Sequence, residues 1–349
     1  MRGPFHVRAR KAREQLRIRI RGVVFAVGVL LGAVVVYSAG EPPSWAYPST
    51  PQGFQRAPDD GSKRHVPLSS REYTYAEIED SFKPADWHPT DHPPMPDPVA
   101  LGRKPDVRAC SWCHLPNGLG HPQSAGLAGL PANYIAAQIG DFSNGKRKPA
   151  VGNTIMAIIS KAMTAAEIKA ASNYYAALKL KPWIKVVEAR TVPKTQIIEG
   201  NLRLPAMPAA NEPIGQRIVE VPQYRERTRF YDSHAGFVAY VPVGSLKKGE
   251  NLVTTGGATI VGGKTVAGKT VGCATCHGID LRGMSVAPGG TTPVPALAGR
   301  SPTYIFRQLY DMQKGARKGA NAALMQPVVG LLAEDDMISI AAYLASRAP

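Results

Sequence analysis

The chain has 349 residues, of which 44% are hydrophobic, so it is long enough to form two or three small domains with buried cores. Its 34 glycines and 31 prolines indicate loop-rich modules with few long regular elements. The net charge is +16, but residues 1–21 carry +7 of it, and no basic surface interleaved with aromatic residues follows, which argues against nucleic-acid binding.

An uncharged stretch follows the basic N-terminal residues. Residues 22–40 hold no charged side chain over 19 positions, about the length that crosses a bilayer as a helix. Arginines stay on the cytoplasmic side, so residues 1–21 are expected to form a basic cytoplasmic arm. We therefore expect a transmembrane anchor at 22–40 in the lipid bilayer of a bacterial inner membrane, with the rest of the chain in the periplasm. The alternative is a cleaved signal peptide, because residues 38–40 are small.

Residues 41–93 are expected to form a Pro-rich linker with one short helix. Prolines recur through residues 41–71 and again from Pro84, which breaks regular structure. The short helix is expected within residues 73–82, and the linker is expected to hold the following domains away from the membrane. His88 and His92 lie in its second Pro-rich part, where a polar loop is favoured over a metal-binding role.

All four cysteines lie in two copies of one pattern, Cys-x-x-Cys-His. The first copy ends at His114 and the second at His277. This pattern is the attachment signature of c-type haem, in which two thiols bond to the porphyrin and the histidine ligates the iron. It predicts two covalently bound haem c groups, attached through Cys110, Cys113, Cys273 and Cys276. A thioredoxin-like dithiol or a zinc site shared between the motifs are the alternatives, but neither requires the following histidines.

Each motif opens an internal repeat, which predicts two copies of one domain. In both copies a Leu-Ala-Gly sequence follows the motif, and a Tyr-Ile pair and an Arg-Lys pair follow in the same order. The expected domains are a first haem domain at 94–184, an insertion at 185–244 and a second haem domain at 245–349. Within and after the insertion, short strands are expected at 218–221 and 237–241, and a hairpin at 258–266.

Capping signals delimit the expected helices of both copies. Ser301 is a predicted N-cap with a proline at the first helical position, and Gly315 ends that helix. The matching helix of the first copy lies between Pro131 and Gly145. The terminal helices begin at a Thr164-x-x-Glu167 capping box and at the acidic residues 334–336.

A second axial ligand is expected on each iron, and methionine at that position raises the reduction potential. Met156 and Met325 follow the two motifs in expected loops at matched repeat positions, so with His114 and His277 they are the predicted iron ligands. Met163 competes with Met156 but has the position of a core residue, and His121 is the second choice in the first copy.

Together these residues resemble the class I cytochrome c superfamily, in particular its tandem dihaem periplasmic members. The resemblance covers about residues 94–180 and 245–347. It implies an all-α fold of two tandem class I cytochrome c domains, here with a small β-containing insertion between them and one N-terminal transmembrane helix. It also implies one histidine- and methionine-ligated haem per domain. Family members often hold the haem-ligating histidine with a proline carbonyl, for which Pro295 is placed, whereas the first copy has Ala125 there.

The family implies an electron carrier, not an enzyme. We expect one-electron transfer in a respiratory chain, from a membrane or periplasmic donor to an acceptor such as an oxidase or soluble cytochrome. The alternatives are a cytochrome subunit of a larger dehydrogenase complex and a dihaem enzyme such as a peroxidase. An enzyme needs an open iron site, which the two predicted methionine ligands disfavour.

Overall fold

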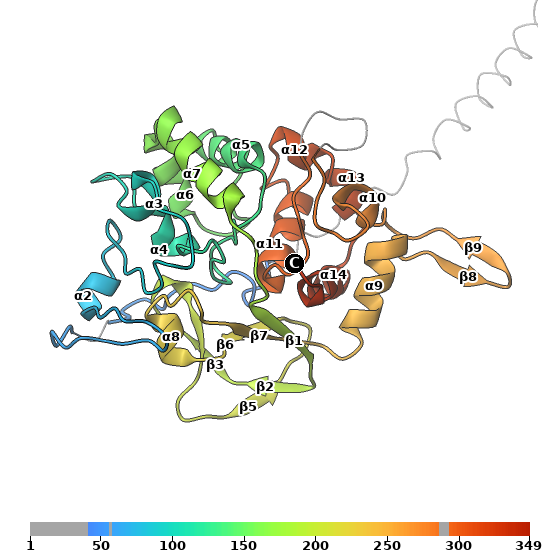
Figure 1. Ribbon diagram of the computed structural model, residues 1–349. Coiled ribbons are helices and arrows are strands. Elements are labelled where there is room, and N and C mark those ends of the chain that lie inside the picture. Colours follow the sequence, from blue (N-terminus) through green and yellow to red (C-terminus); the bar gives the residue numbers. More distant parts are fainter. Residues whose placement is uncertain (1–40, 56–57, 286–292) are drawn as a thin grey trace, which may run out of the picture. The chain divides into compact units, whose positions relative to one another are not determined.

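The computed structural model describes residues 41–55, 58–285 and 293–349 (Figure 1). The basic arm predicted at 1–21 and the membrane anchor predicted at 22–40 lie outside these residues. Among the helices of the described ranges, none combines the length and the apolar character that a membrane crossing requires.

The first haem motif belongs to a group of five helices. They are α3 (Asp97–Ala100), α4 (Cys110–His114), α5 (Ala132–Ser143), α6 (Ile155–Ala162) and α7 (Ala165–Ala177). Helix α7 begins at the predicted capping box, in which the Thr164 side chain accepts from the Glu167 backbone N–H and the Glu167 side chain returns to Thr164. A buried cluster that includes Tyr134, Ile135 and Tyr175 joins α5 to α7.

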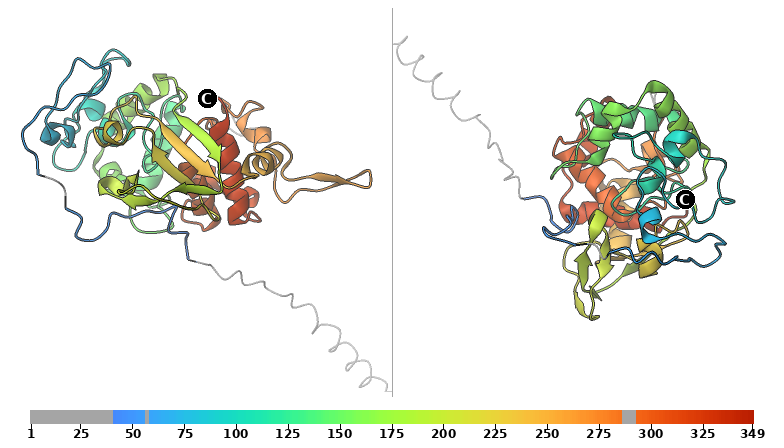
Figure 2. Two further views of the ribbon diagram at one scale, coloured as in Figure 1. Left: turned by 90° about the horizontal axis from the view of Figure 1, so that it is seen from below. Right: turned by 90° about the vertical axis from the view of Figure 1, so that its left-hand side faces the viewer.

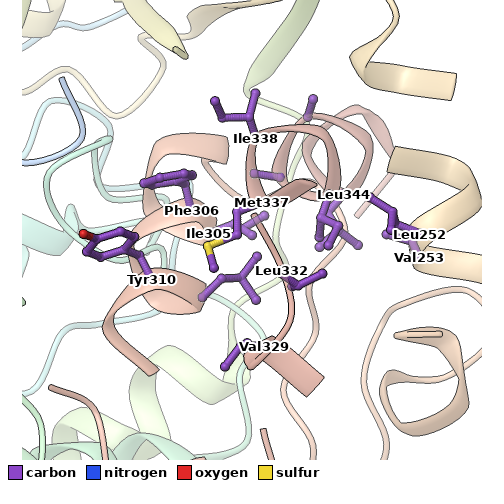
Figure 3. Packing of buried hydrophobic residues seen from close by; sticks show 14 of the residues in the cluster. Leu252, Val253, Ile305, Phe306, Tyr310, Val329, Leu332, Met337, Ile338 and Leu344 are labelled. Atoms are coloured by element: carbon purple, nitrogen blue, oxygen red, sulfur yellow. The ribbon is translucent and has the colours of Figure 1, made fainter. Parts of the chain in front are cut away.

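The second motif belongs to a larger helical group. It comprises α9 (Ser245–Thr255), α10 (Ala274–His277), α11 (Pro302–Gln313), α12 (Ala320–Ala323), α13 (Gln326–Val329) and α14 (Glu334–Ser346). The Ser301 side chain caps α11 as predicted by accepting from the Tyr304 N–H. Helix α14 lies between α9 and α11, and Figure 3 shows Met337 and Leu344 among the side chains of α11 and α9.

Glycine allows α9 and α14 to approach closely. A Cβ atom at Gly249 would lie 2.0 Å from the Ser339 carbonyl oxygen, so no other residue fits without separating the two helices. The sequence signals did not single out α9, because its buried face is short and a glycine lies within it. The packing partner therefore determines this helix more than its own propensity does.

The β structure is more extensive than the small insertion that we expected. A three-stranded sheet has the order β1 (Ile184–Glu188), β7 (Phe237–Val241), β6 (Val219–Pro222), with β1 parallel and β6 antiparallel to β7. Strands β6 and β7 match the predicted positions to within a residue. Two short antiparallel pairs lie within the insertion, β2 (Thr191–Pro193) with β5 (Asn211–Pro213) and β3 (Thr195–Ile197) with β4 (Arg203–Pro205). A third pair, β8 (Thr259–Val261) with β9 (Lys264–Val266), is the predicted hairpin. It projects outward in Figures 1 and 2.

The Pro-rich segment after residue 41 is packed against the protein instead of spanning open space. The Trp45 ring lies 4.5 Å from that of Phe306 on α11, and the Tyr47 hydroxyl donates to Asp311 at 2.6 Å. Further along, the short predicted helix is α2 (Tyr75–Ile78), and the Trp87 indole N–H donates to the Phe230 carbonyl beside α8 (Arg225–Arg229). Aromatic side chains between the prolines thus attach this segment to both the second helical group and the insertion.

Candidate functional site

The first motif forms the single short helix α4, which places both thiols and the imidazole on one turn. The His114 Nδ1–H donates to the Ala125 carbonyl at 2.7 Å, which leaves Nε2 available as a ligand atom. Burial lowers the pKa of His114, although its bond to Ala125 opposes that shift, so the ring is neutral as metal binding requires.

The second motif repeats this geometry on α10. The His277 Nδ1–H donates to the Pro295 carbonyl at 2.9 Å, and burial again lowers the pKa of the ring. In both copies, the backbone carbonyl at the position that the family resemblance implies therefore accepts the hydrogen bond from the motif histidine. Alanine serves as well as proline in the first copy because the backbone oxygen, not the side chain, accepts the bond.

A crevice beside α4 brings together several predicted residues of the first site. Cys110, Cys113 and His114 line it, and so do Met156 and Met163. Met156 is the second residue of α6 and not a loop residue, because the Thr154 side chain caps that helix by accepting from the Met156 N–H. Both methionines face the crevice, so Met156 as the iron ligand stays a prediction.

The remaining candidates lie as follows. Met325 directly precedes α13 and packs, partly buried, against the second core, as Cys273 also does. His121 does not line the crevice; it is buried in the wall of an adjoining cavity. Burial lowers the pKa of His121 to about 4.

The second helical group completes the crevice of the first motif. Tyr304, Arg307, Gln308 and Asp311 of α11 line it together with the residues of α4 and α5. A reciprocal pair of arginines joins the two groups at this point. Arg147 and Arg317 each donate to both Gln138 and Gln308, at distances between 2.8 and 3.1 Å.

Each arginine of the pair also donates a hydrogen bond to a tyrosine of the other copy. Arg147 donates to the Tyr304 hydroxyl of the second copy at 3.0 Å, and Arg317 donates to Tyr134 of the first copy at 2.9 Å. Sequence comparison of the copies found these arginines and tyrosines as matched positions. It did not reveal that each arginine contacts the other copy, because a repeat pattern does not report contacts between its members.

The folded thiols are poorly reactive. Burial raises the pKa of Cys110 to about 12 and the pKa of Cys113 to about 11, and burial also raises the pKa of Cys273 to about 11. Because the thiolate is the nucleophile and these thiols stay protonated at neutral pH, their chemistry is not that of a dithiol redox pair. A role in thioether bonds fits their burial.

The two motifs differ in how much of the chain covers them. Cys276 is exposed, and exposed apolar side chains lie next to it in sequence, with Ile279 96% and Met284 37% accessible. Cys113, its counterpart, borders a cavity enclosed by the Pro-rich segment, the insertion and α11. The second motif is thus exposed at its second cysteine, whereas other segments of the chain lie over the second cysteine of the first motif.

Two histidines outside the motifs lie together. His88 and His234 stack with ring centroids 3.6 Å apart and planes 8° apart, and Asp232 lies within ligand distance of both. An ion held between parallel rings would lie outside both ring planes, whereas the imidazole lone pair lies in the plane. Asp232 also accepts from Arg227 at 2.6 Å, so the cluster is a hydrogen-bonded connection between the Pro-rich segment and the insertion.

These geometries fit covalently attached haem. In each copy two thiols and a neutral imidazole share one helical turn, and a backbone carbonyl fixes the imidazole orientation. When bound, haem iron takes up or releases one electron by changing between its ferrous and ferric states.

Comparison with known sequences agrees with this assignment. The family model described as Cytochrome c matches residues 260–348. Cytochrome c-554(548) of Halomonas halodenitrificans is 40% identical over 76 residues, which cover 22% of this chain and 83% of that protein. The thiosulfate dehydrogenase electron acceptor of Thiomonas intermedia is 26% identical over 247 residues, covering 70% of this chain and 80% of that protein. A solved structure of cytochrome c4 from Acidithiobacillus ferrooxidans aligns with a TM-score of 0.41 and 21% identity, over 68% of this chain and 98% of that one.

The chain belongs to the cytochrome c family. Within it, the protein is a dihaem c-type cytochrome that functions in electron transfer and binds haem c covalently.

Proposed function

We propose that this protein is an electron carrier and not an enzyme, and that its two haems act in series. Cys110 and Cys113 hold the first haem and Cys273 and Cys276 the second. His114 with Met156, and His277 with Met325, ligate the two irons. With both axial positions taken by the chain, each site changes charge without binding a substrate, which suits a carrier.

The single observation that carries the serial arrangement is the shared wall of the first crevice. Residues of α11, which follows the second motif, line the crevice of the first motif. The buried arginines 147 and 317 hold the two helical groups together at this wall. Haem held by the first motif would therefore contact residues of α11, the helix that follows the second motif, and we infer that electrons pass between the two sites across these residues.

We propose that the partner docks at the Cys276 edge. This cysteine is exposed and the exposed apolar residues Ile279 and Met284 follow it in sequence, whereas Cys113 borders a cavity lined by other segments of the chain. Because a similar protein is named a thiosulfate dehydrogenase electron acceptor, we propose a dehydrogenase as the donor, with this chain as its partner subunit. The haem domains are placed in the periplasm, anchored to the inner membrane by residues 22–40.

A charge placed at the exposed edge tests this docking. Ile279→Glu should slow electron exchange with a small cytochrome partner at least fivefold in stopped-flow measurements, because the side chain is 96% exposed beside the second motif. Leu68→Glu is the matched control, since Leu68 is 90% exposed and remote in sequence from both motifs. Equal rates for the two variants would place the docking face elsewhere.

A further inference from the structure

Arg307 is a cation of the second copy that lies in the wall of the first crevice. It belongs to α11, which follows the second motif, and it lines the crevice together with His114 and Met156. One end of its guanidinium group donates to the Ala46 carbonyl at 3.1 Å, and the other end donates to the Pro122 carbonyl in the loop after the first motif. Two backbone carbonyls from other parts of the chain therefore fix its charge at the first site.

The guanidinium group of Arg307 forms its hydrogen bonds with neutral groups. Asp311, the acidic residue of the same wall, accepts instead from the Tyr47 hydroxyl at 2.6 Å and from the Ala150 N–H at 2.8 Å. Burial lowers the pKa of Arg307, but a guanidinium group keeps its proton at neutral pH. The wall therefore contains a positive charge that is hydrogen-bonded to carbonyl groups and not to a carboxylate.

Comparison of the two copies shows that this cation is unmatched. Other charged residues at the junction occur in both copies: Arg147 with Arg317, Lys148 with Lys318, and Asp141 with Asp311. In the register of these pairs Arg307 corresponds to Ala137, so it is the charged residue by which α11 differs from α5. Arg108, a further cation of the crevice, corresponds to Val271 and adds to the same difference.

A positive charge close to haem iron favours the ferrous state, because the ferric state carries one more positive charge. The effect is larger inside a protein than in water, since the dielectric constant there is lower. The unmatched charge of Arg307 therefore acts on the reduction potential of the first site, whose crevice it lines.

We propose that Arg307 sets the order of the two reduction potentials by making the first haem the more readily reduced. An electron that enters at the second site then moves to the first site and stays there until an acceptor takes it. This direction rests on the docking of the donor at the Cys276 edge proposed above, whereas the effect of Arg307 on the first potential does not.

Redox titration of the purified holoprotein, followed by haem absorbance, tests this role. Arg307→Gln removes the charge, so it should lower the higher of the two midpoint potentials and leave the lower one in place. The distribution of one electron between the haems should change tenfold in favour of the second haem, equal to about 59 mV for a one-electron couple. Arg307→Lys keeps the charge without the fork of donors, and should retain both potentials.

Arg300→Gln is the matched control. Arg300 is also an arginine of the second copy that donates to backbone carbonyls of the first copy, at Gly126 and Ala128, but it does not line the crevice. Its replacement should destabilise the protein in urea titrations and leave both midpoint potentials in place. A variant without Cys110 and Cys113 retains the second haem alone, and its potential identifies the lower of the two values.

Three results would overturn the role of Arg307. They are an Arg307→Gln variant in which neither potential moves, one in which the potential of the second haem falls, and an equal effect of Arg300→Gln. A high-spin iron in the wild-type protein would instead contradict the carrier function proposed above. The comparison of the two arginine variants would still decide this inference, because it requires only that the first haem has a measurable potential.

Discussion

The two haem motifs have the same local structure but different surroundings. In both, a histidine donates from Nδ1 to a backbone carbonyl that follows it in the chain, at Ala125 in the first copy and at Pro295 in the second. Around the first motif, the Pro-rich segment and the insertion enclose the Cys113 side, whereas Cys276 is exposed. The comparison teaches that five consecutive residues specify the cofactor chemistry, while distant segments of the chain determine what can reach it.

Removing each pair of thiols should have the largest effect and tests whether the motifs are independent. Cys273→Ala with Cys276→Ala should lower the haem content from two to one per chain, measured by mass spectrometry and alkaline pyridine absorbance. The matching pair at Cys110 and Cys113 should do the same. Loss of the Cys273 and Cys276 pair should also destabilise the protein more than loss of the other pair, because Cys273 packs against the larger core. A variant that keeps both haems contradicts the assignment.

The axial ligands provide the next test. The first crevice contains two candidate methionines, Met156 and Met163, whereas Met325 is the one candidate for the second motif. Met156→Ala should lower one of the two midpoint potentials by on the order of 100 mV, within the range over which axial ligands tune haem. The near-infrared sulfur-to-iron band should lose about half its intensity. Met163→Ala is the control and should leave both signals in place; the reverse pattern would make Met163 the ligand.

The arginine pair tests how strongly the two copies are coupled. Arg317→Gln removes donors from the Tyr134 hydroxyl and from Gln138, so it should lower the free energy of unfolding by about 2 kcal/mol in urea titrations. Combining it with Arg147→Gln should cost less than the sum of the single changes, since both arginines donate to the same two glutamines. Strict additivity would mean that the two arginines act independently of each other.

The terminal helices allow a direct comparison of a buried carboxylate with a partly exposed one, each in an ion pair. Burial favours the neutral form of Asp336, but hydrogen bonds from Lys248 and Lys269 outweigh it and hold the pKa below its usual 3.8. A carboxylate with a lowered pKa stabilises the fold above pH 3.8, and this contribution disappears as the pH falls further. Asp336→Asn should therefore cost about 1–3 kcal/mol at pH 7 and progressively less below pH 4.

Glu167 has the same position at the start of α7, where its hydrogen bond with Arg103 lowers its pKa to about 2. The cations are similarly exposed, 49% for Arg103 and 47% for Lys269, but the Glu167 side chain is 17% exposed and the Asp336 side chain 0%, so solvent weakens the Glu167 pair more. Glu167→Gln should be milder than Asp336→Asn at pH 7 in urea titrations. If the two substitutions lower the free energy of unfolding equally, burial of the carboxylate does not determine the strength of these ion pairs.

Sequence signals predicted the parts of the fold that rest on local interactions. Thr164 and Ser301 cap helices where expected, and the Cys-x-x-Cys-His motifs form single turns. The parts that were not predicted depend on tertiary contacts. Helix α9 needs Gly249 against α14, and the cover over Cys113 needs segments far apart in the chain that have no shared pattern. Met156 was expected in a loop because the Thr154 cap is a weak signal next to prolines and glycines.

The wall that α11 contributes to the first crevice bears on how the protein matures. Residues 304–311 are synthesised well after the first motif, so for a time that crevice lacks one side. Burial suppresses the thiolate at Cys110 and Cys113 once the fold is complete. We therefore expect the thioether bonds of the first motif to form while the chain is incomplete, so that residues 304–311 later pack over a haem that is already attached.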